Sequence, residues 1–236
     1  MSSHIWRYLD LSKLIYLVDN AALHFTRIVQ FKDKFEGSYP IKNLEDWNER
    51  YPTVGDFSHW RKFVCVSCWY ESENESAAMW ELYSRDDQGV AICSTKDKLK
   101  KSFDGGSDDV HFDNVKYIDF IRDKGKIESP LDVSLYKRIE FGFEREFRGV
   151  LFEIPENDGF ENGFPNYGSV EKQKGFPKDG QGKAVKPEVL IEKLVVSPYA
   201  KPWYKKVVKD VLEKYKLSSV EVKESELAVD PVYPKQ

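Results

Sequence analysis

The sequence is poor in the residues that build disulfide frameworks and metal centres. Its three cysteines are Cys65, Cys68 and Cys93, and an odd number cannot pair completely. Free thiols in a reducing compartment are therefore expected. The C-V-S-C segment lacks the second ligand pair that a zinc site needs, and the four histidines show no ligand spacing. Residues three apart in a strand point to opposite faces, so we expect Cys65 and Cys68 to serve packing.

An excess of charge of one sign and a long apolar run are also absent. Lys and Arg number 36 against 40 Asp and Glu, a net charge of −4. This balance excludes a general attraction to nucleic acid or to acidic membranes. The longest apolar run near the N-terminus, residues 14–18, is too short for a signal sequence or a membrane span. The sequence predicts a cytoplasmic protein with no membrane partner.

The chain does have the material for a large core, with 41% hydrophobic and 14% aromatic residues. Apolar residues run through both halves with one polar gap, which predicts a single domain over residues 1–236. The gap, at about 157–186, holds six of the 14 glycines and five lysines: Lys172, Lys174, Lys178, Lys183 and Lys186. This composition predicts a basic loop that is poorly ordered without a partner.

Hydrophobic periodicity predicts interleaved strands and helices without regular alternation. This pattern favours an α+β fold with a mixed or split β-sheet flanked by helices. Asp10 is a good helix cap, and Ser72 with Glu75 forms a capping-box pattern. The strands are expected at 5–8, 23–27, 63–69, 89–93, 115–120, 142–151, 194–196 and 219–222. The helices are expected at 11–20, 43–50, 72–84, 95–103, 131–139 and 202–215.

The segment G-F-E-R-E-F-R-G-V-L at 142–151 is the most unusual one. As a strand it places Glu144, Glu146 and Arg148 on one face and the aromatic residues on the other. One interpretation is an exposed face on which Arg148 neutralises Glu146. The other is a cleft in which one carboxylate stabilises developing positive charge and the second orients or deprotonates an acceptor. Carboxylate pairs of this kind serve glycosyl-type chemistry, whose transition state is a cationic sugar.

Both ends of the chain resemble ADP-ribosyltransferases. The opening I-W-R-Y-L-D-L-S-K-L-I-Y-L-V-D-N-A-A-L-H-F-T-R is similar to their first strand, helix and second strand, most closely in the DarT-like enzymes that modify DNA from NAD. The segment E-K-L-V-V-S-P-Y-A-K-P-W-Y-K-K-V-V-K-D-V-L is similar to their closing strand and helix. The resemblance implies an ADP-ribosyltransferase-like fold and NAD as substrate, with no metal.

Shorter motifs, spread over nearly the whole chain, resemble a widespread bacterial domain family of unknown function. They are F-K-D-K-F-E-G (31–37), S-A-A-M-W-E-L-Y (76–83), G-V-A-I (89–92), E-R-E-F-R (144–148) and V-S-P (196–198). Members of that family often occur in phage-defence loci, so a toxin or antiviral defence effector is implied. One departure is Lys34, where the family usually has proline, and it leaves the form of that turn open.

The transferase pattern assigns roles to individual residues. Glu146 is expected to bond the ribose 2′-hydroxyl and stabilise the oxocarbenium ion, and Glu144 to position the acceptor. Arg7 is expected to hold the NAD phosphates or ribose, because its guanidinium forks onto oxyanions. The remaining cofactor-binding candidates are Tyr8 on the first strand, Ser67 at the end of 63–67, and Trp80 and Tyr83, which stack on nicotinamide or shape its pocket.

The acceptor is an unknown macromolecule, nucleic acid or protein, which the lysines of the basic loop are expected to attract. Two other functions stay open. One is a non-catalytic interaction protein, a defence sensor or antitoxin-like partner, recognised by Arg148 closing a salt bridge over Glu146 with no cavity beside Trp80. The other is a nucleic-acid-processing enzyme that uses the loop as a clamp, although the sequence shows no cluster of metal-binding carboxylates.

Overall fold

The computed structural model describes residues 4–50, 61–84, 86–107, 109–129, 131–152, 160–161, 164–165 and 179–232. The chain forms two compact units. Unit 1 consists of Met1–Leu23, Trp69–Ser107 and Lys183–Gln236, and unit 2 of His24–Cys68 and Asp108–Gly182. Each combines helices with β-strands, so the predicted α+β class with a mixed sheet is confirmed. The expectation of a single domain stays a prediction.

The sheet of unit 1 is built around two long antiparallel strands, β1 (His4–Asp10) and β4 (Gly89–Thr95), which pair along their whole length. β12 (Lys193–Val196) pairs antiparallel with the other edge of β4. β13 (Glu221–Glu224) then adds to β12 in parallel, which makes the sheet mixed. On the far side of β1, the end of β3 (Val64–Glu71) pairs with it antiparallel.

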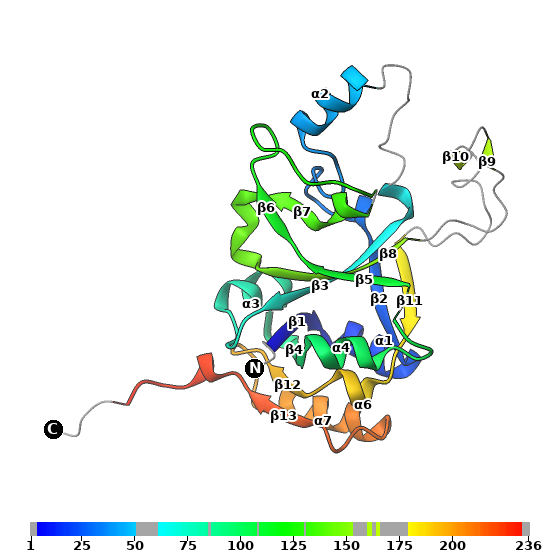
Figure 1. Ribbon diagram of the computed structural model, residues 1–236. Helices are drawn as coiled ribbons and strands as arrows, with labels where there is room; N and C mark the ends of the chain where they lie inside the picture. The colour runs from blue at the N-terminus through cyan, green and yellow to red at the C-terminus, as the bar shows by residue number, and fades with distance from the viewer. Residues whose placement is uncertain are drawn as a thin grey trace. The chain divides into compact units, whose positions relative to one another are not determined.

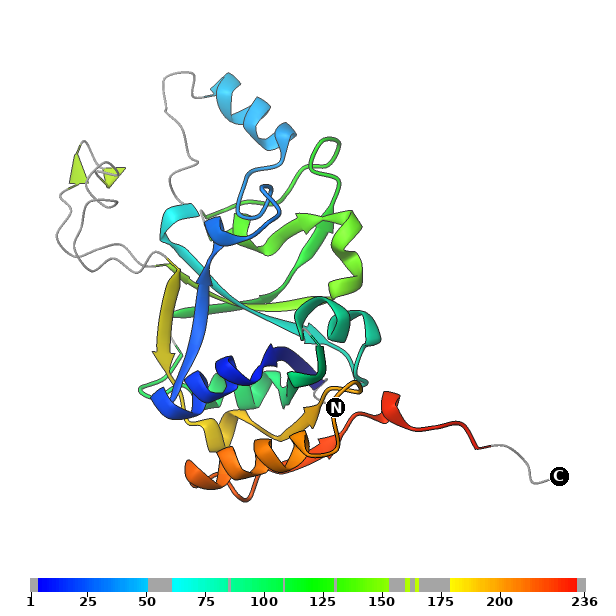
Figure 2. The same ribbon diagram turned by 180° about the vertical axis from the view of Figure 1, so that it is seen from behind.

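Helices pack against this sheet (Figures 1 and 2). α1 (Leu11–Asn20) begins where the sequence predicts it, because the Asp10 carboxylate accepts the backbone N–H of Lys13 at 2.9 Å. It ends as predicted at Asn20, where Ala21 adopts a left-handed conformation with φ of 45°. The other helices of unit 1 are α3 (Ala77–Tyr83), α4 (Lys96–Ser102), α6 (Pro187–Leu190) and α7 (Tyr204–Lys214), with 3-10 turns at Asp86–Gln88 and Glu226–Ala228.

The core of unit 1 follows the two-residue period of its strands. Trp6 and Tyr8 point from β1 into one cluster with Met79 and Trp80 of α3. The predicted capping box at Ser72 is wrong: α3 begins one turn later, where the Ser76 hydroxyl accepts the backbone N–H of Met79.

Unit 2 is organised around β8 (Glu146–Phe152), which pairs with β3 and antiparallel with β5 (Val110–Asn114). β2 (Ala22–Arg27) pairs antiparallel with β3. β11 (Gly180–Ala184) lies beside β2. Its remaining elements are α2 (Ile41–Arg50), the parallel pair β6 (Lys116–Ile118) and β7 (Tyr136–Arg138), the hairpin of β9 (Phe160–Glu161) and β10 (Phe164–Pro165), and the 3-10 helices η1 (Ile28–Gln30), η4 (Asp132–Leu135) and η5 (Ile139–Glu144).

Three predictions for unit 2 are wrong. No strand is predicted at 110–114, where β5 forms. The apolar spacing of Leu131, Leu135 and Ile139 predicts a helix, but the chain forms η4, then β7, then η5. The predicted strand over 142–151 begins only at Glu146, because residues 139–144 form a 3-10 helix that Arg145 ends with φ of 40°. The second error arises because the apolar residues spaced by four fall on separate elements: Leu131 precedes η4, Leu135 ends it, and Ile139 begins η5 after β7.

Gly180 provides a test of the packing of unit 2. Its φ is +128°, and a Cβ atom built on it lies 2.0 Å from the carbonyl oxygen of Phe25. Gly180→Ala should lower the free energy of unfolding by more than about 2 kcal/mol, since backbone strain and a backbone clash add. Gly106→Ala is the matched control, because Gly106 also has a positive φ but open space around it. Equal losses for both variants, measured by urea unfolding, would contradict the close approach.

Candidate functional site

Five charged side chains are buried together in unit 2. Three carboxylates and two cations contribute, and each side chain is at most 7% exposed. They come from a turn after η1, from β7, from the end of η5 and from β8. This group, named here the charged cluster, consists of Glu36, Lys137, Glu144, Glu146 and Arg148.

Arg148 lies at the centre of the charged cluster and is completely buried. Its Nε donates to Glu146 at 2.7 Å, and both terminal nitrogens donate to Glu36, at 2.9 and 3.2 Å. The remaining two donors reach the Ser134 carbonyl at 2.7 Å and the second oxygen of Glu146 at 3.1 Å. All five N–H groups of the guanidinium are thus used. Arg148 holds two carboxylates in fixed positions and has no donor left for a ligand.

Lys137 joins the three carboxylates. Its Nζ lies 2.5 Å from Glu144, 2.7 Å from Glu146 and 3.0 Å from Glu36. β7 aims this side chain inward, while the parallel pairing with β6 places Tyr117 opposite it. The sequence interpretation missed Lys137 because it predicted a helix there. It also missed Glu36, although the F-K-D-K-F-E-G motif contains it.

A tight turn positions Glu36. The Glu36 N–H donates to the Asp33 carbonyl at 3.1 Å, and the Asp33 carboxylate accepts the N–H of Phe35. Lys34 occupies the second position of this turn, where proline is also favoured. Gly37 follows with φ of +71°. A Cβ atom added at this glycine would lie 3.0–3.2 Å from side-chain atoms of Ile28. Lys34 is therefore compatible with a closed turn at this position.

The two glutamates that the sequence singles out lie in contrasting electrostatic environments. For Glu144, burial and a hydrogen bond with Glu146 outweigh the attraction of Lys137 and raise its pKa from 4.5 to about 7. For Glu146, burial opposes ionisation, but Arg148 and Lys137 outweigh it and hold the pKa below its usual value. Glu144 therefore carries a proton over much of the range below neutrality, whereas Glu146 stays ionised.

Two further groups touch Glu146. The Tyr117 hydroxyl accepts the backbone N–H of Glu146 at 2.8 Å. The Cys68 thiol hydrogen-bonds to the Glu146 side chain, and burial together with the charge of Glu146 raises the pKa of this thiol. Cys68 is thus a neutral donor at the edge of the charged cluster. All three cysteines are free thiols.

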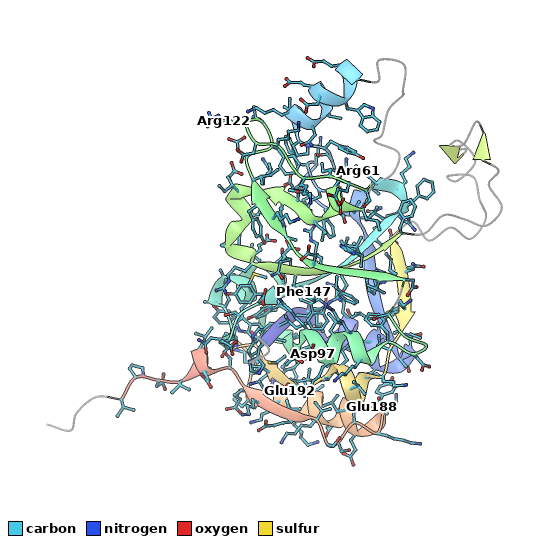
Figure 3. The ribbon with its side chains drawn as sticks, viewed as in Figure 1. Arg61, Asp97, Arg122, Phe147, Glu188 and Glu192 are labelled. Atoms are coloured by element: carbon cyan, nitrogen blue, oxygen red, sulfur yellow. The ribbon has the colours of Figure 1, made fainter. Side chains whose placement is uncertain are left out.

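The strand face predicted for 144–148 is partly correct. Glu146 and Arg148 share one face of β8, and Phe147, labelled in Figure 3, points to the other and stacks on Phe112. Glu144 is not on the strand. It reaches the cluster because Arg145 turns the chain between η5 and β8. Glu144 and Glu146 are thus close together, as predicted, but a turn between η5 and β8 brings them together and not a shared strand face.

The other predicted residue of unit 2, Ser67, is 1% exposed and lies within β3 rather than at its end, since the strand continues to Glu71. In unit 1, Arg7 of β1 lies over the Trp69 ring, with its guanidinium carbon 5.7 Å from the ring centroid. The predicted site residues thus divide between the two units.

Tyr8 and Trp80 are brought together in unit 1. Their rings meet edge to face with centroids 4.9 Å apart, and the Tyr8 hydroxyl accepts the backbone N–H of Ser76 at 2.8 Å. Trp80 is 0% exposed and donates from its indole nitrogen to Glu75 at 2.7 Å. Tyr83, the last residue of α3, is 44% exposed. Of the predicted aromatic residues, Tyr83 therefore presents the most ring surface.

The lysines of the predicted basic loop are only partly described. Lys172, Lys174 and Lys178 lie outside the described residues. Lys183 belongs to β11 and places its Nζ 5.9 Å from the Phe103 ring centroid. Lys186 precedes α6 and pairs with Asp104 at 3.3 Å.

The described residues offer neither a metal-binding group nor a membrane-spanning helix. No group of three or more histidine, cysteine, aspartate or glutamate side chains in the described ranges is arranged to hold a metal ion. Among the helices that the structure describes, none has the length and apolar character to cross a membrane.

Comparisons with known proteins give no family assignment. No protein-family model matches the chain, and no curated protein matches it. Among solved structures, three complexes of Thermus sp. 2.9 DarT align with TM-scores of 0.42, 0.39 and 0.42 at 9%, 9% and 8% identity. Their ligands are ADP-ribosylated ssDNA, carba-NAD+ and NAD+, respectively. The alignments cover 95–96% of this chain and 95–96% of DarT. At these TM-scores the likeness carries no functional argument.

The proton on Glu144 has a consequence for stability. Its pKa of about 7 exceeds the ordinary value of 4.5, so its contribution to the free energy of unfolding is full below pH 4.5 and is lost as pH rises through 7. Glu144→Gln imitates the protonated acid and cannot ionise. The free energy of unfolding of this variant, relative to that of the wild type, should therefore increase by at least about 1 kcal/mol from pH 5 to pH 8. One pKa unit corresponds to about 1.4 kcal/mol.

Urea unfolding at both pH values measures this gain. Glu140→Gln is the matched control, because Glu140 belongs to η5 but is exposed. A stability difference between Glu144→Gln and the wild type that is the same at pH 5 and pH 8 would mean that Glu144 is ionised throughout.

Proposed function

We propose that the protein is an ADP-ribosyltransferase that uses NAD as donor and the charged cluster of unit 2 as its reactive centre. One observation carries the proposal: three buried carboxylates meet only two cations, and one carboxyl group holds a proton near neutral pH. The donor's identity comes from the sequence resemblance at both ends of the chain. The shorter motifs, which resemble the bacterial family found in phage-defence loci, support a toxin or phage-defence effector, and the acceptor is a macromolecule.

A purely structural role explains this arrangement poorly. Burying ions costs several kcal/mol each, and replacing a buried ion network by apolar residues is often neutral or stabilising. A surplus carboxylate makes the network still less favourable. Pairs of titratable groups whose pKa values are driven apart are typical of acid–base sites, where one group moves a proton and the other keeps its charge. Glu144 and Glu146 form such a pair.

Glu146 is suited to stabilise positive charge. In the proposed reaction the bond between C1′ of the ribose and the nicotinamide nitrogen breaks, and its electron pair leaves with nicotinamide. The oxocarbenium ion that remains is attracted by the ionised Glu146. Hydrogen bonds from Arg148 and Lys137 fix this carboxylate in place before the reaction. The ribose 2′-hydroxyl would replace the bond from the Cys68 thiol, which is the weakest donor on Glu146.

Glu144 is suited to the acceptor side. The acceptor's nucleophilic atom forms the new bond to C1′, and its proton passes to the ionised form of Glu144. A base with a pKa of about 7 is matched to this task at neutral pH. The rate of transfer is then expected to rise with pH through about 7.

The resemblance assigns donor binding to other residues. Arg148 has no donor left for the NAD phosphates. The resemblance gives this role to Arg7. Tyr83 would stack on nicotinamide, while Trp80 and Tyr8 support α3 from within the core of unit 1. Ser67 completes the donor-binding set on the transferase pattern.

Replacing the charge on Glu146 tests the proposal. Glu146→Gln should lower the rate of NAD consumption about 100- to 1,000-fold, the loss expected when one preorganised electrostatic group is removed. Labelled NAD is incubated with the wild type, with this variant and with Glu140→Gln, which should retain full activity. Circular dichroism and urea unfolding at the assay temperature confirm that each variant is folded. Wild-type turnover by a folded Glu146→Gln would remove Glu146 from the mechanism.

One observation favours a second candidate, a non-catalytic interaction protein. Arg148 closes the salt bridge on Glu146 at 2.7 Å, which is one of the two features expected of this alternative. This candidate predicts neither NAD binding nor NAD consumption by the wild type, alone or with cell lysate. Isothermal titration calorimetry with NAD separates the two candidates, because the transferase must bind its donor and the interaction protein need not.

A further inference from the structure

Glu36 is the one carboxylate of the charged cluster to which neither the sequence nor the proposed mechanism gives a role. It is 2% exposed and lies more than 100 residues before its partners in the chain. Its two oxygens bind both terminal nitrogens of Arg148, and one of them also binds Lys137 at 3.0 Å. Glu36 therefore competes with Glu146 and Glu144 for the same two positive charges.

The charge count shows what this competition does. With Glu36 ionised, the two cations of the charged cluster are matched by Glu36 and Glu146, which share Arg148 and Lys137. Glu144 is then a third carboxylate with no cation of its own, because its cationic neighbour, Lys137, also binds Glu36 and Glu146. A buried, uncompensated charge is costly, and the group takes up a proton instead. Without Glu36, two carboxylates would face two cations.

We infer that Glu36 is a positioning residue that decides which group of the charged cluster carries the proton, by holding Arg148 and Lys137 so that Glu144 is the acid. The raised pKa of Glu144 and the lowered pKa of Glu146 agree with this assignment. The effect on turnover rests on the proposed function, whereas the effect on the proton does not.

Other titratable and charged groups face the charged cluster from the elements packed against it. Tyr117 faces Glu146 from β6, and burial raises the pKa of its hydroxyl. Cys68 faces it from β3 as a neutral thiol. Beyond Glu36, Asp33 pairs with Arg138 at 3.1 Å. Arg61 lies within electrostatic reach of both Glu36 and Asp33. Counted together, Asp33, Arg138 and Arg61 add one positive charge outside the buried cluster. The cation in contact with Glu144 is Lys137, which Glu36 and Glu146 share, so Glu144 still has no cation of its own.

Carbon-13 NMR of carboxyl-labelled glutamate tests the inference on the full chain. The Glu144 signal is identified by its disappearance in Glu144→Gln. In the wild type it should titrate near pH 7, and in Glu36→Gln its midpoint should fall by about one pH unit or more, the usual effect of a nearby charge. Glu140→Gln is the control and should leave the midpoint unchanged. An unchanged midpoint in Glu36→Gln would overturn the inference.

A double variant keeps the test decisive if Glu36→Gln does not fold. Glu36→Gln with Arg148→Gln removes one charge of each sign, and replacing both partners of a buried pair is less disruptive than removing one. The surplus carboxylate returns, so Glu144 should again titrate within about half a pH unit of the wild type. A fall of the midpoint to the ordinary range of a glutamate in the double variant would contradict the charge count.

The pH profile of NAD consumption separates this inference from the proposed function. If Glu144 is the base, the rising limb of the profile should move down in Glu36→Gln by the same amount as the NMR midpoint. If Glu36→Gln shifts the NMR midpoint of Glu144 but not the rising limb of the pH profile, the role of Glu36 is supported and Glu144 is not the base. A wild type that consumes no NAD contradicts the proposed function, while the NMR titration still decides the role of Glu36.

Discussion

The hydrogen bonds of the Arg148 guanidinium are the constraint on which the centre of unit 2 depends. A buried guanidinium must place five donors, and here two carboxylates and one carbonyl accept all of them. This requirement fixes the turn that carries Glu36, the end of η4 at Ser134 and the first residues of β8 relative to one another. Lys137 then has carboxylate oxygens on three sides, and Glu144 remains as the group whose charge is not balanced.

The same constraint links structure to chemistry. Because Arg148 and Lys137 saturate Glu146, that carboxylate keeps its charge and its orientation, which favours electrostatic stabilisation of a cation. Glu144 is held by a single cation and can exchange its proton near neutral pH. Two glutamates separated by one residue in the sequence thus have pKa values shifted in opposite directions because their partners differ. Burial supplies the low dielectric that makes this difference large.

Sequence alone predicted the elements whose side chains have a clear period. β1, α1 and its Asp10 cap, β4 and the amphipathic α7 follow from alternation or helical spacing. The pairing of Glu146 with Arg148 followed from their shared strand face. The inward position of Lys137 did not, because η4, β7 and η5 are each too short to set a period of their own. The contact of Glu36 with Arg148 joins residues 112 apart, which local patterns do not encode.

In the proposed function the charged cluster is retained for chemistry rather than for stability. The direct test replaces all five members at once by apolar residues of similar volume: Glu36→Leu, Lys137→Met, Glu144→Leu, Glu146→Leu and Arg148→Met. Its free energy of unfolding and its rate of NAD consumption are measured beside those of the wild type. We expect the variant with all five replacements to be folded, to be at least as stable as the wild type and to consume no NAD. A folded variant that consumes NAD at the wild-type rate would contradict it. So would a marked loss of stability together with a wild type that is itself inactive.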